Sequence, residues 1–162
     1  MLNRFLGRVH RFIAASFDGN IEAICIRHLE KSASFGNSWA QNQLGVRYLR
    51  GAGVAKDLRK AVDLFKLAAE QNQVEGCLNL AWIYSDEEYS EKSLTESIRW
   101  YRVAIENGSP IAEYNLGLLY IDGIGVEKDY RKGFSLLKSA SDKGLKEAIE
   151  AIQKVSEKGY GI

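Results

Sequence analysis

Apolar residues recur at spacings of three and four along most of the chain, which predicts a series of amphipathic helices. The stretch 40–72 sets the pattern, because its apolar skeleton returns 36 residues later and again after a further 36. A fixed period in the range of about 20–50 residues indicates a protein built from stacked structural repeats. The main recurrences are Leu44 as Leu80 and Leu116, Tyr48 as Tyr84 and Tyr120, Phe65 as Tyr101 and Leu137, and Ala68 as Ala104 and Ala140.

Each full unit predicts two helices joined by a tight turn. In the first unit, Asn37 or Ser38 is expected to cap a helix that ends near residue 50. Gly51 and Gly53 then permit the positive φ of a tight turn, and Asp57 is a suitable cap for the second helix. The third unit repeats these signals with Ser109 and Pro110 at its start, Gly123 and Gly125 in its turn, and Asp129 before its second helix.

The period divides the chain into three full units and two partial ones, which predicts a single all-α repeat domain of about nine helices. In the N-terminal unit, helices are expected at 2–15 and at about 21–35, and the last helix of the chain is expected at about 146–158. The units are a degenerate N-terminal unit at 1–36, full repeats at 37–72, 73–108 and 109–144, and a C-terminal half-repeat cap at 145–162.

The middle repeat keeps both helices but loses the glycine turn. An acidic segment stands in its place, and Ser93 or Thr95 is expected to cap the helix that follows. This loop is a secondary candidate for binding a basic partner or a cation, although a solvated loop without ordered ligand spacing is the simpler interpretation. Its acidic residues are Asp86, Glu87, Glu88 and Glu91.

Composition and charge argue against several classes of protein. Lys and Arg number 22 against 21 Asp and Glu, so the net charge of +1 does not suggest a nucleic-acid partner. The longest apolar run near the N-terminus is short, so we expect neither a membrane-spanning helix nor a signal peptide. The two cysteines do not form the regular pairs of a disulfide-stapled secreted repeat, which favours a reducing compartment and a cytoplasmic location.

The repeated motif resembles the Sel-one-like repeat, a relative of the tetratricopeptide repeat. The family implies a right-handed superhelical solenoid of antiparallel helix pairs that binds proteins or peptides and rarely catalyses a reaction. The motif is carried by Ala40, Leu44, Gly45, Tyr48, Gly51, Gly53, Val54, Asp57, Lys60, Ala61, Phe65, Ala68 and Ala69, and it recurs at Ala112, Leu116, Gly117, Tyr120, Gly123, Gly125, Val126, Asp129 and Lys132.

By analogy with tetratricopeptide stacks, the first helix of each pair is expected to line a concave face. The large aromatic side chains on this face suit an interaction surface, because they offer area at little entropic cost. The competing interpretation is that Val46, Trp82 and Leu118 form a structural column that packs between repeats. The predicted partner-binding residues are Trp39, Asn42, Val46, Leu78, Trp82, Tyr114, Leu118 and Ile121.

These features predict a non-enzymatic interaction module that acts as an adaptor or regulator through a protein or peptide partner. The alternative is a bacterial immunity protein that neutralises a cognate secreted toxin, as some stand-alone family members do. We expect no membrane insertion, no cofactor and no metal. The sequence does not decide whether the protein forms homo-oligomers.

A thiol-based sensor or enzyme using Cys25 is the third alternative. Cys25 and His28 share a helix face, but the repeat register places Cys25 in the column of Ala61, so both side chains are expected to point into the stack. Two ligands are also too few for a structural zinc site.

Overall fold

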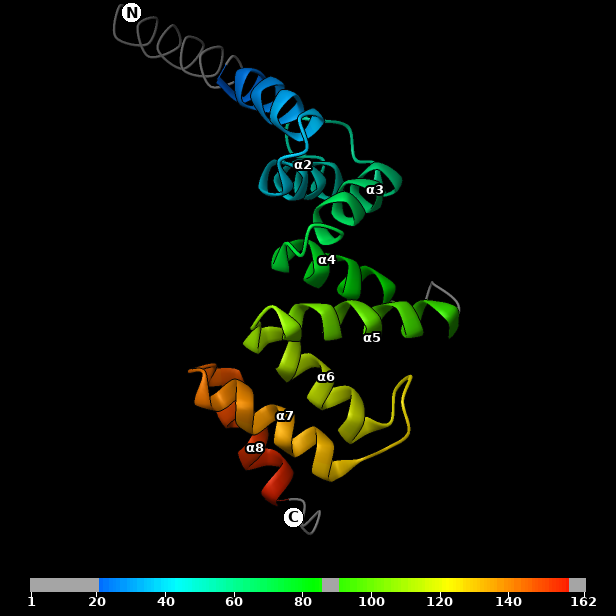
Figure 1. Cartoon of the computed structure of the whole chain (residues 1–162), viewed down its shortest axis with the longest axis vertical. Coiled ribbons are helices and arrows are strands. Elements are labelled where there is room, and N and C mark those ends of the chain that lie inside the picture. Colours follow the sequence, from blue (N-terminus) through cyan, green and yellow to red (C-terminus); the bar gives the residue numbers. More distant parts are fainter. Residues whose placement is uncertain (1–20, 86–90, 158–162) are drawn as a thin grey trace, which may run out of the picture. The chain divides into compact units, whose positions relative to one another are not determined.

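The computed structural model describes residues 21–85 and 91–157, and every regular element in these two ranges is a helix (Figure 1). Residues 21–34 are helical, as the apolar spacing predicted. The predicted helix at 2–15, the acidic residues Asp86, Glu87 and Glu88, and the side chain of Glu91 lie outside the described residues. The labelled helices are α2 (Ser38–Arg50), α3 (Leu58–Ala69), α4 (Val74–Tyr84), α5 (Glu91–Glu106), α6 (Pro110–Asp122), α7 (Tyr130–Asp142) and α8 (Lys146–Glu157).

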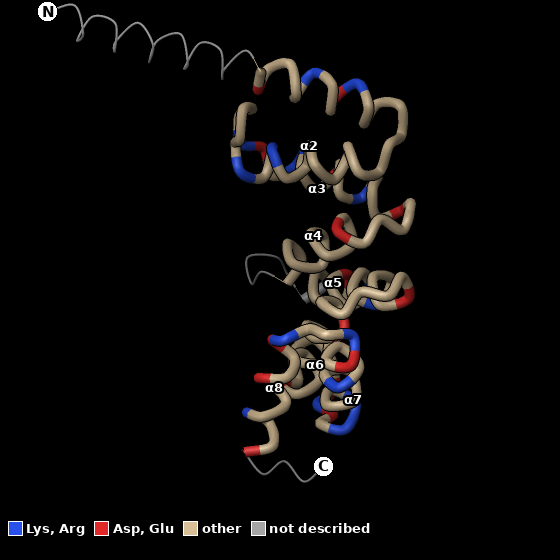
Figure 2. The backbone as a smooth tube through the Cα atoms, turned by 90° about the vertical axis from the view of Figure 1, so that its left-hand side faces the viewer, with Lys and Arg blue, Asp and Glu red and all other residues tan. Residues whose placement is uncertain are grey.

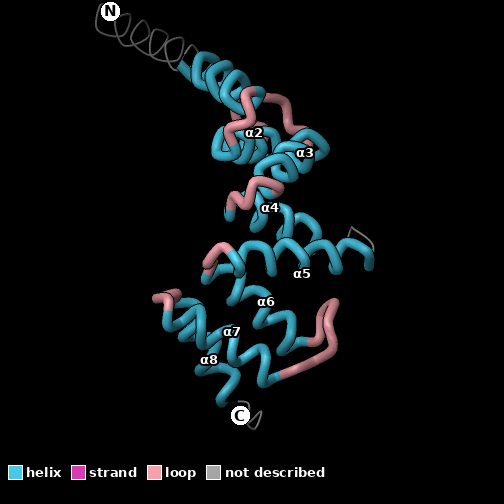
Figure 3. The backbone as a smooth tube through the Cα atoms, viewed as in Figure 1, coloured by secondary structure: helices cyan, strands magenta, loops and turns pink. Residues whose placement is uncertain are grey.

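The chain divides into two compact units, with the boundary between Leu67 and Ala68. In the second unit α4 packs on α5, α5 on α6, α6 on α7 and α7 on α8 (Figure 1). The loops after α2 and α6 are the two long connections of the described chain, as Figure 3 shows. Each of these two loops contains the predicted glycine turn.

Local signals set the helix ends where the sequence placed them. The side chain of Asn37 accepts a hydrogen bond from the backbone N–H of Ala40 and caps α2. Gly51 ends α2 in the left-handed region at φ 71°, where residues with a Cβ are strained. The same signals recur around α3, α6 and α7: Asp57 accepts from the N–H of Lys60, Ser109 from that of Ala112 and Asp129 from that of Lys132, and Gly123 ends α6 at φ 74°.

The predicted cap of α5 is wrong. The helix begins at Glu91, so Ser93 and Thr95 lie within its first turns and cap nothing. The segment from Glu91 to Ser97 contains neither Gly nor Pro. Because nothing in it interrupts the backbone hydrogen bonds, the helix extends toward the N-terminus past both residues.

α6 and α7 run antiparallel and meet at two glycines. Glu113 lies opposite Ser139, and Gly117 lies opposite Gly133. A Cβ built on Gly133 would stand 2.7 Å from the carbonyl oxygen of Gly117, so the close approach of the two backbones requires glycine there. The buried cluster beside this crossing contains Ile121, Leu137, Ala151 and Val155.

The first unit has its own small core. Ala33, Ala40 and Leu44 form its buried cluster, with Leu29, Tyr48 and Leu64 packed against it. The repeat column of Phe65, Tyr101 and Leu137 is buried in every full repeat, with exposures of 0%, 5% and 0%. None of the helices in the described ranges is long and apolar enough to cross a membrane.

Candidate functional site

A groove between α6 and α8 lies on the predicted partner-binding face. Its volume is about 280 Å³, and three of its lining residues, Tyr114, Leu118 and Ile121, belong to the predicted set. Ala151 and Val155 of α8 complete the apolar lining. Tyr114 and Leu118 are half-buried, whereas Ile121 is 6% exposed and belongs to the core beneath them.

The polar lining of this groove is mainly acidic. Asp122 follows the apolar residues of α6, and α8 contributes Glu147, Glu150 and Lys154. Three carboxylates against one ammonium leave a formal charge of −2 along the groove. Figure 2 marks the acidic and basic positions of α8 along its backbone.

The α8 residues of the groove were missed by the sequence prediction, which treated α8 as a solvent-facing cap. The repeat register contains the signal that finds them. α8 is the first helix of a fourth unit, and a shift of 36 residues carries Tyr114 onto Glu150 and Leu118 onto Lys154. The positions that face a groove in the third repeat therefore also face it in the half-repeat.

The predicted residues of α4 lie outside this groove but on the same unit. Trp82 is 60% exposed, and Leu78 is half-buried. An indole with more than half of its surface in water is unusual for a residue whose only role is packing, because burial of a Trp side chain contributes strongly to stability. Its exposure makes Trp82 a candidate contact residue.

The predicted residues of α2 belong to the first unit and differ among themselves. Trp39 is 59% exposed and accessible to a partner. Val46 is half-buried, and Asn42 is only 3% exposed. Asn42 and Ile121 are thus buried in the free protein, because the face of a first helix turns partly toward its neighbouring helices.

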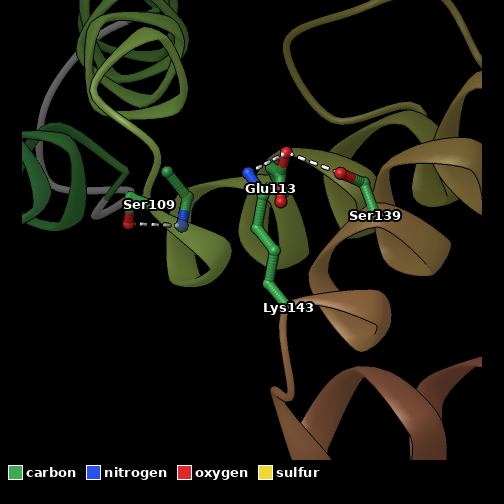
Figure 4. Close-up of polar contacts among 5 residues, drawn as sticks. Ser109, Glu113, Ser139 and Lys143 are labelled. Carbon is green, nitrogen blue, oxygen red and sulfur yellow. Dashed lines mark hydrogen bonds and ion pairs between the residues drawn. The ribbon is translucent and has the colours of Figure 1, made fainter.

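A buried carboxylate holds α6 against α7 next to Tyr114 (Figure 4). Oε1 of Glu113 accepts hydrogen bonds from the Ser139 hydroxyl at 2.8 Å and from Lys143 Nζ at 2.9 Å. Oε2 of Glu113 is buried and has no partner among the described residues. The charge-assisted pair fixes the register of α6, and with it the position of the neighbouring groove residues.

The residues that occupy the Glu113 position in the other two repeats, Gln41 and Cys77, contact backbone carbonyl oxygens instead. Gln41 donates from Nε2 to the carbonyl oxygen of Ala33 at 3.2 Å, and the Cys77 thiol lies 3.9 Å from that of Ala69. Burial raises the pKa of the Cys77 thiol to about 11, so it stays protonated.

Cys25 and His28 contradict the prediction that they point into the stack. Both are exposed. Ala61, the repeat equivalent of Cys25, is buried because its unit supplies a preceding helix, whereas the helix predicted before Cys25 falls in residues outside the description. Within 21–85 and 91–157, no group of three or more His, Cys, Asp or Glu side chains is arranged to hold a metal ion.

Comparison with known proteins shows which family the repeat matches. A family model described as Sel1 repeat matches residues 40–73, 74–109 and 110–145. Proteins with this repeat are generally protein-interaction modules, and the fold is typically a non-catalytic scaffold. A curated relative, the ERAD-associated E3 ubiquitin-protein ligase component HRD3B of Arabidopsis thaliana, is 34% identical over 105 residues, which are 64% of this chain and 16% of that protein.

Two crystal structures are also similar to the chain. A Sel1 repeat protein from Oxalobacter formigenes has a TM-score of 0.80 at 30% identity, over 87% of this chain and 58% of that one. A protective antigen present in uropathogenic Escherichia coli strains, which displays an SLR fold, has a TM-score of 0.77 at 30% identity, over 83% of this chain and 29% of that one. These similarities confirm the predicted all-α repeat fold, and this chain spans only part of each relative.

Proposed function

Because the chain belongs to the Sel1 repeat family, we propose that it is a non-enzymatic interaction module that binds a partner protein or peptide on the face formed by the first helices of its repeats. The observation that carries this proposal is the groove between α6 and α8. Its lining combines a half-buried aromatic residue, Tyr114, with the aliphatic Leu118 and an acidic border. Apolar grooves with a few polar groups at their edges are the usual form of a peptide-binding site.

Exposed aromatic residues on the first helices of two repeats also support the proposal. Trp82 presents a large apolar area in the unit that holds the groove, and Trp39 does so in the other unit. Trp and Tyr dominate the energetics of protein interfaces, since they bury much area while few rotatable bonds become ordered. A partner that covered Trp82 would remove this area from water.

The charge of the groove indicates the chemistry of the partner. With carboxylates at Asp122, Glu147 and Glu150, the groove suits a segment that carries Lys or Arg beside an apolar anchor. We propose a reducing compartment such as the cytoplasm, because Cys25 and Cys77 do not recur as a cysteine pair in each repeat. In the alternative function, an immunity protein, this partner would be the cognate toxin.

Site-directed photocrosslinking tests the proposal. A photoreactive phenylalanine analogue at position 82 or 114 is expressed in the native cell, and the crosslinked proteins are identified by mass spectrometry. The same analogue at Ile124 is the matched control, because Ile124 is 47% exposed but lies in the loop after α6. One partner crosslinked from both position 82 and position 114, and not from position 124, is the expected result.

The affinity of the identified partner is then measured for the Trp82→Ala and Tyr114→Ala variants. A loss of about tenfold or more is expected for each, as for aromatic hot-spot residues, while Ile124→Ala leaves the affinity unchanged. Equal crosslinking from all three positions, or full affinity in both aromatic variants, would exclude this face as the binding site.

A further inference from the structure

Tyr120, at the C-terminal end of α6, lies between two cations from different helices. Arg102 of α5 donates from Nη2 to the Tyr120 hydroxyl at 3.3 Å. The Lys132 ammonium of α7 lies 4.4 Å from the centre of the Tyr120 ring. The interaction with Lys132 is the largest cause of a lowered pKa at Tyr120, and the hydrogen bond from Arg102 acts in the same direction against the effect of burial.

In the described part of the chain, neither cation forms an ion pair with a carboxylate. Among the residues that the structure describes, no Asp or Glu lies within ion-pair distance of Arg102 or Lys132. The first repeat differs at this point, because Lys60, the equivalent of Lys132, pairs with Asp57 at 3.7 Å. Asp129 accepts a hydrogen bond from the backbone of Lys132 and makes no such pair with its side chain.

The repeat register shows that this like-charged arrangement is particular to the third repeat. A shift of 36 residues carries Arg102 and Lys132 onto Lys66 and Glu96, and a second shift carries them onto Glu30 and Lys60. The first two repeats therefore place one positive and one negative residue at these positions. Only the third places two positive residues there, around a tyrosine that all three share.

Two cavities open beside these cations. One, of about 650 Å³, is lined by Tyr120 and by the segment 126–132, which includes Lys132. The other, of about 400 Å³, is lined by Arg102 and Arg99 of α5 and also reaches Val126. The basic residues in the two linings are Arg99, Arg102, Lys128, Arg131 and Lys132, against the acidic residues Glu106, Glu127 and Asp129.

Two like charges held beside one tyrosine side chain repel each other, and a bound anion reduces this repulsion. We propose that Arg102, Lys132 and Tyr120 form a binding site for a phosphate monoester, carried by a small molecule or by a phosphorylated peptide. The guanidinium supplies a planar pair of donors, the ammonium a point charge, and the phenol a further donor. A phosphate monoester, with close to two negative charges, matches the two cations better than a carboxylate does.

Binding is measured by isothermal titration calorimetry on the full chain with three probes at equal ionic strength. These probes are inorganic phosphate, a short phosphoserine peptide and acetate. Saturable binding of phosphate is expected, with a dissociation constant about tenfold or more below that of acetate, because the dianion can satisfy both cations. Tighter binding of the peptide than of inorganic phosphate assigns the site to peptides, and equal binding assigns it to small molecules.

The variants follow the charge pattern of the other repeats. Arg102→Glu gives the third repeat the arrangement of the first, and Lys132→Gln removes the second cation. Lys132→Gln is expected to weaken phosphate binding by about tenfold, the loss expected for one charge-assisted hydrogen bond, and Arg102→Glu by more, because it also places a carboxylate beside the anion. Lys60→Gln is the matched control at the same motif position, where the ammonium lies 5.2 Å from the Tyr48 ring, and it should not change binding.

Nuclear magnetic resonance of the wild-type protein supplies a readout that needs no variant to bind or fold well. Tyrosine labelled at Cζ reports the ionisation of each phenol, and Tyr120→Phe assigns the signal. Phosphate is expected to raise the pKa of Tyr120, since an anion beside the phenol opposes its ionisation. Absence of saturable binding, equal binding of acetate, or an unchanged Tyr120 signal at saturation would overturn the proposal.

Discussion

Replacing Gly133 by Ala tests whether the spacing of α6 and α7 depends on a glycine contact. The added Cβ would stand 2.6 Å from Cγ1 of Ile121, 2.7 Å from the carbonyl oxygen of Gly117 and 3.2 Å from the backbone nitrogen of Ile121. Two of these three atoms belong to the backbone of α6, which cannot rotate away as a side chain can. The two helices must therefore move apart by several tenths of an ångström.

Two opposing effects set the size of the change. Overpacking of a well-packed contact costs about 1–3 kcal/mol. Alanine in place of glycine within a helix recovers about 1 kcal/mol of backbone entropy. Because the clash is with backbone, we expect the upper part of the first range and a net loss of about 1–2 kcal/mol in the free energy of unfolding.

Urea denaturation followed by circular dichroism measures this loss, with the dependence on denaturant expected to stay unchanged. Ser135→Ala is the matched control, since Ser135 is an exposed residue of the same helix. It should be neutral or slightly stabilising, by about 0.5 kcal/mol or less. A Gly133→Ala variant as stable as the wild type would show that this glycine does not set the helix spacing.

Three further predictions concern the core and its buried polar groups. Phe65→Ala should lower the free energy of unfolding by about 3–5 kcal/mol, because Phe65 is 0% exposed, and a thermal melt without a large shift would contradict its place in the core. Burial raises the pKa of the Cys77 thiol from 9.0 in the unfolded chain to about 11 in the folded protein. The contribution of this thiol to the free energy of unfolding is therefore complete below pH 9 and falls by roughly 1.4 kcal/mol per pH unit between these two values. Denaturation of Cys77→Ala over the same pH range should lack this component, and identical pH profiles for variant and wild type would refute the assignment. Lys143→Met should lower the free energy of unfolding by about 1–2 kcal/mol, because it leaves the buried Glu113 without its ion-pair partner; this figure is reduced for the partial exposure of Lys143. In a double-mutant cycle, the further change Glu113→Gln should recover most of this loss.

Some features of the fold follow from short-range rules that can be read along the chain. Asn37 and Asp129 cap helices because a side-chain oxygen reaches an N–H only three residues away. Gly51 and Gly123 end helices because they alone accept the left-handed backbone without strain. The buried column that contains Phe65 follows from the period of the apolar residues.

The candidate sites depended on packing that the linear pattern does not contain. Asn42 and Trp39 share a predicted face, yet the first is 3% exposed and the second 59%. Cys25 was expected to be buried and is exposed, although its repeat equivalent Ala61 is 0% exposed. For Asn42 and Trp39, exposure is set by the helices packed around α2 and not by the position of the residue in the repeat.

The sequence by itself determined the period, the helix pairs and most helix caps, because these depend on interactions within a few residues. Only the tertiary structure decided that Asn42 is buried while Trp39 is exposed, and that Arg102 meets Tyr120 across 18 residues of chain. Such contacts arise where helices pack, and packing depends on side-chain volumes and charges contributed by several repeats at once.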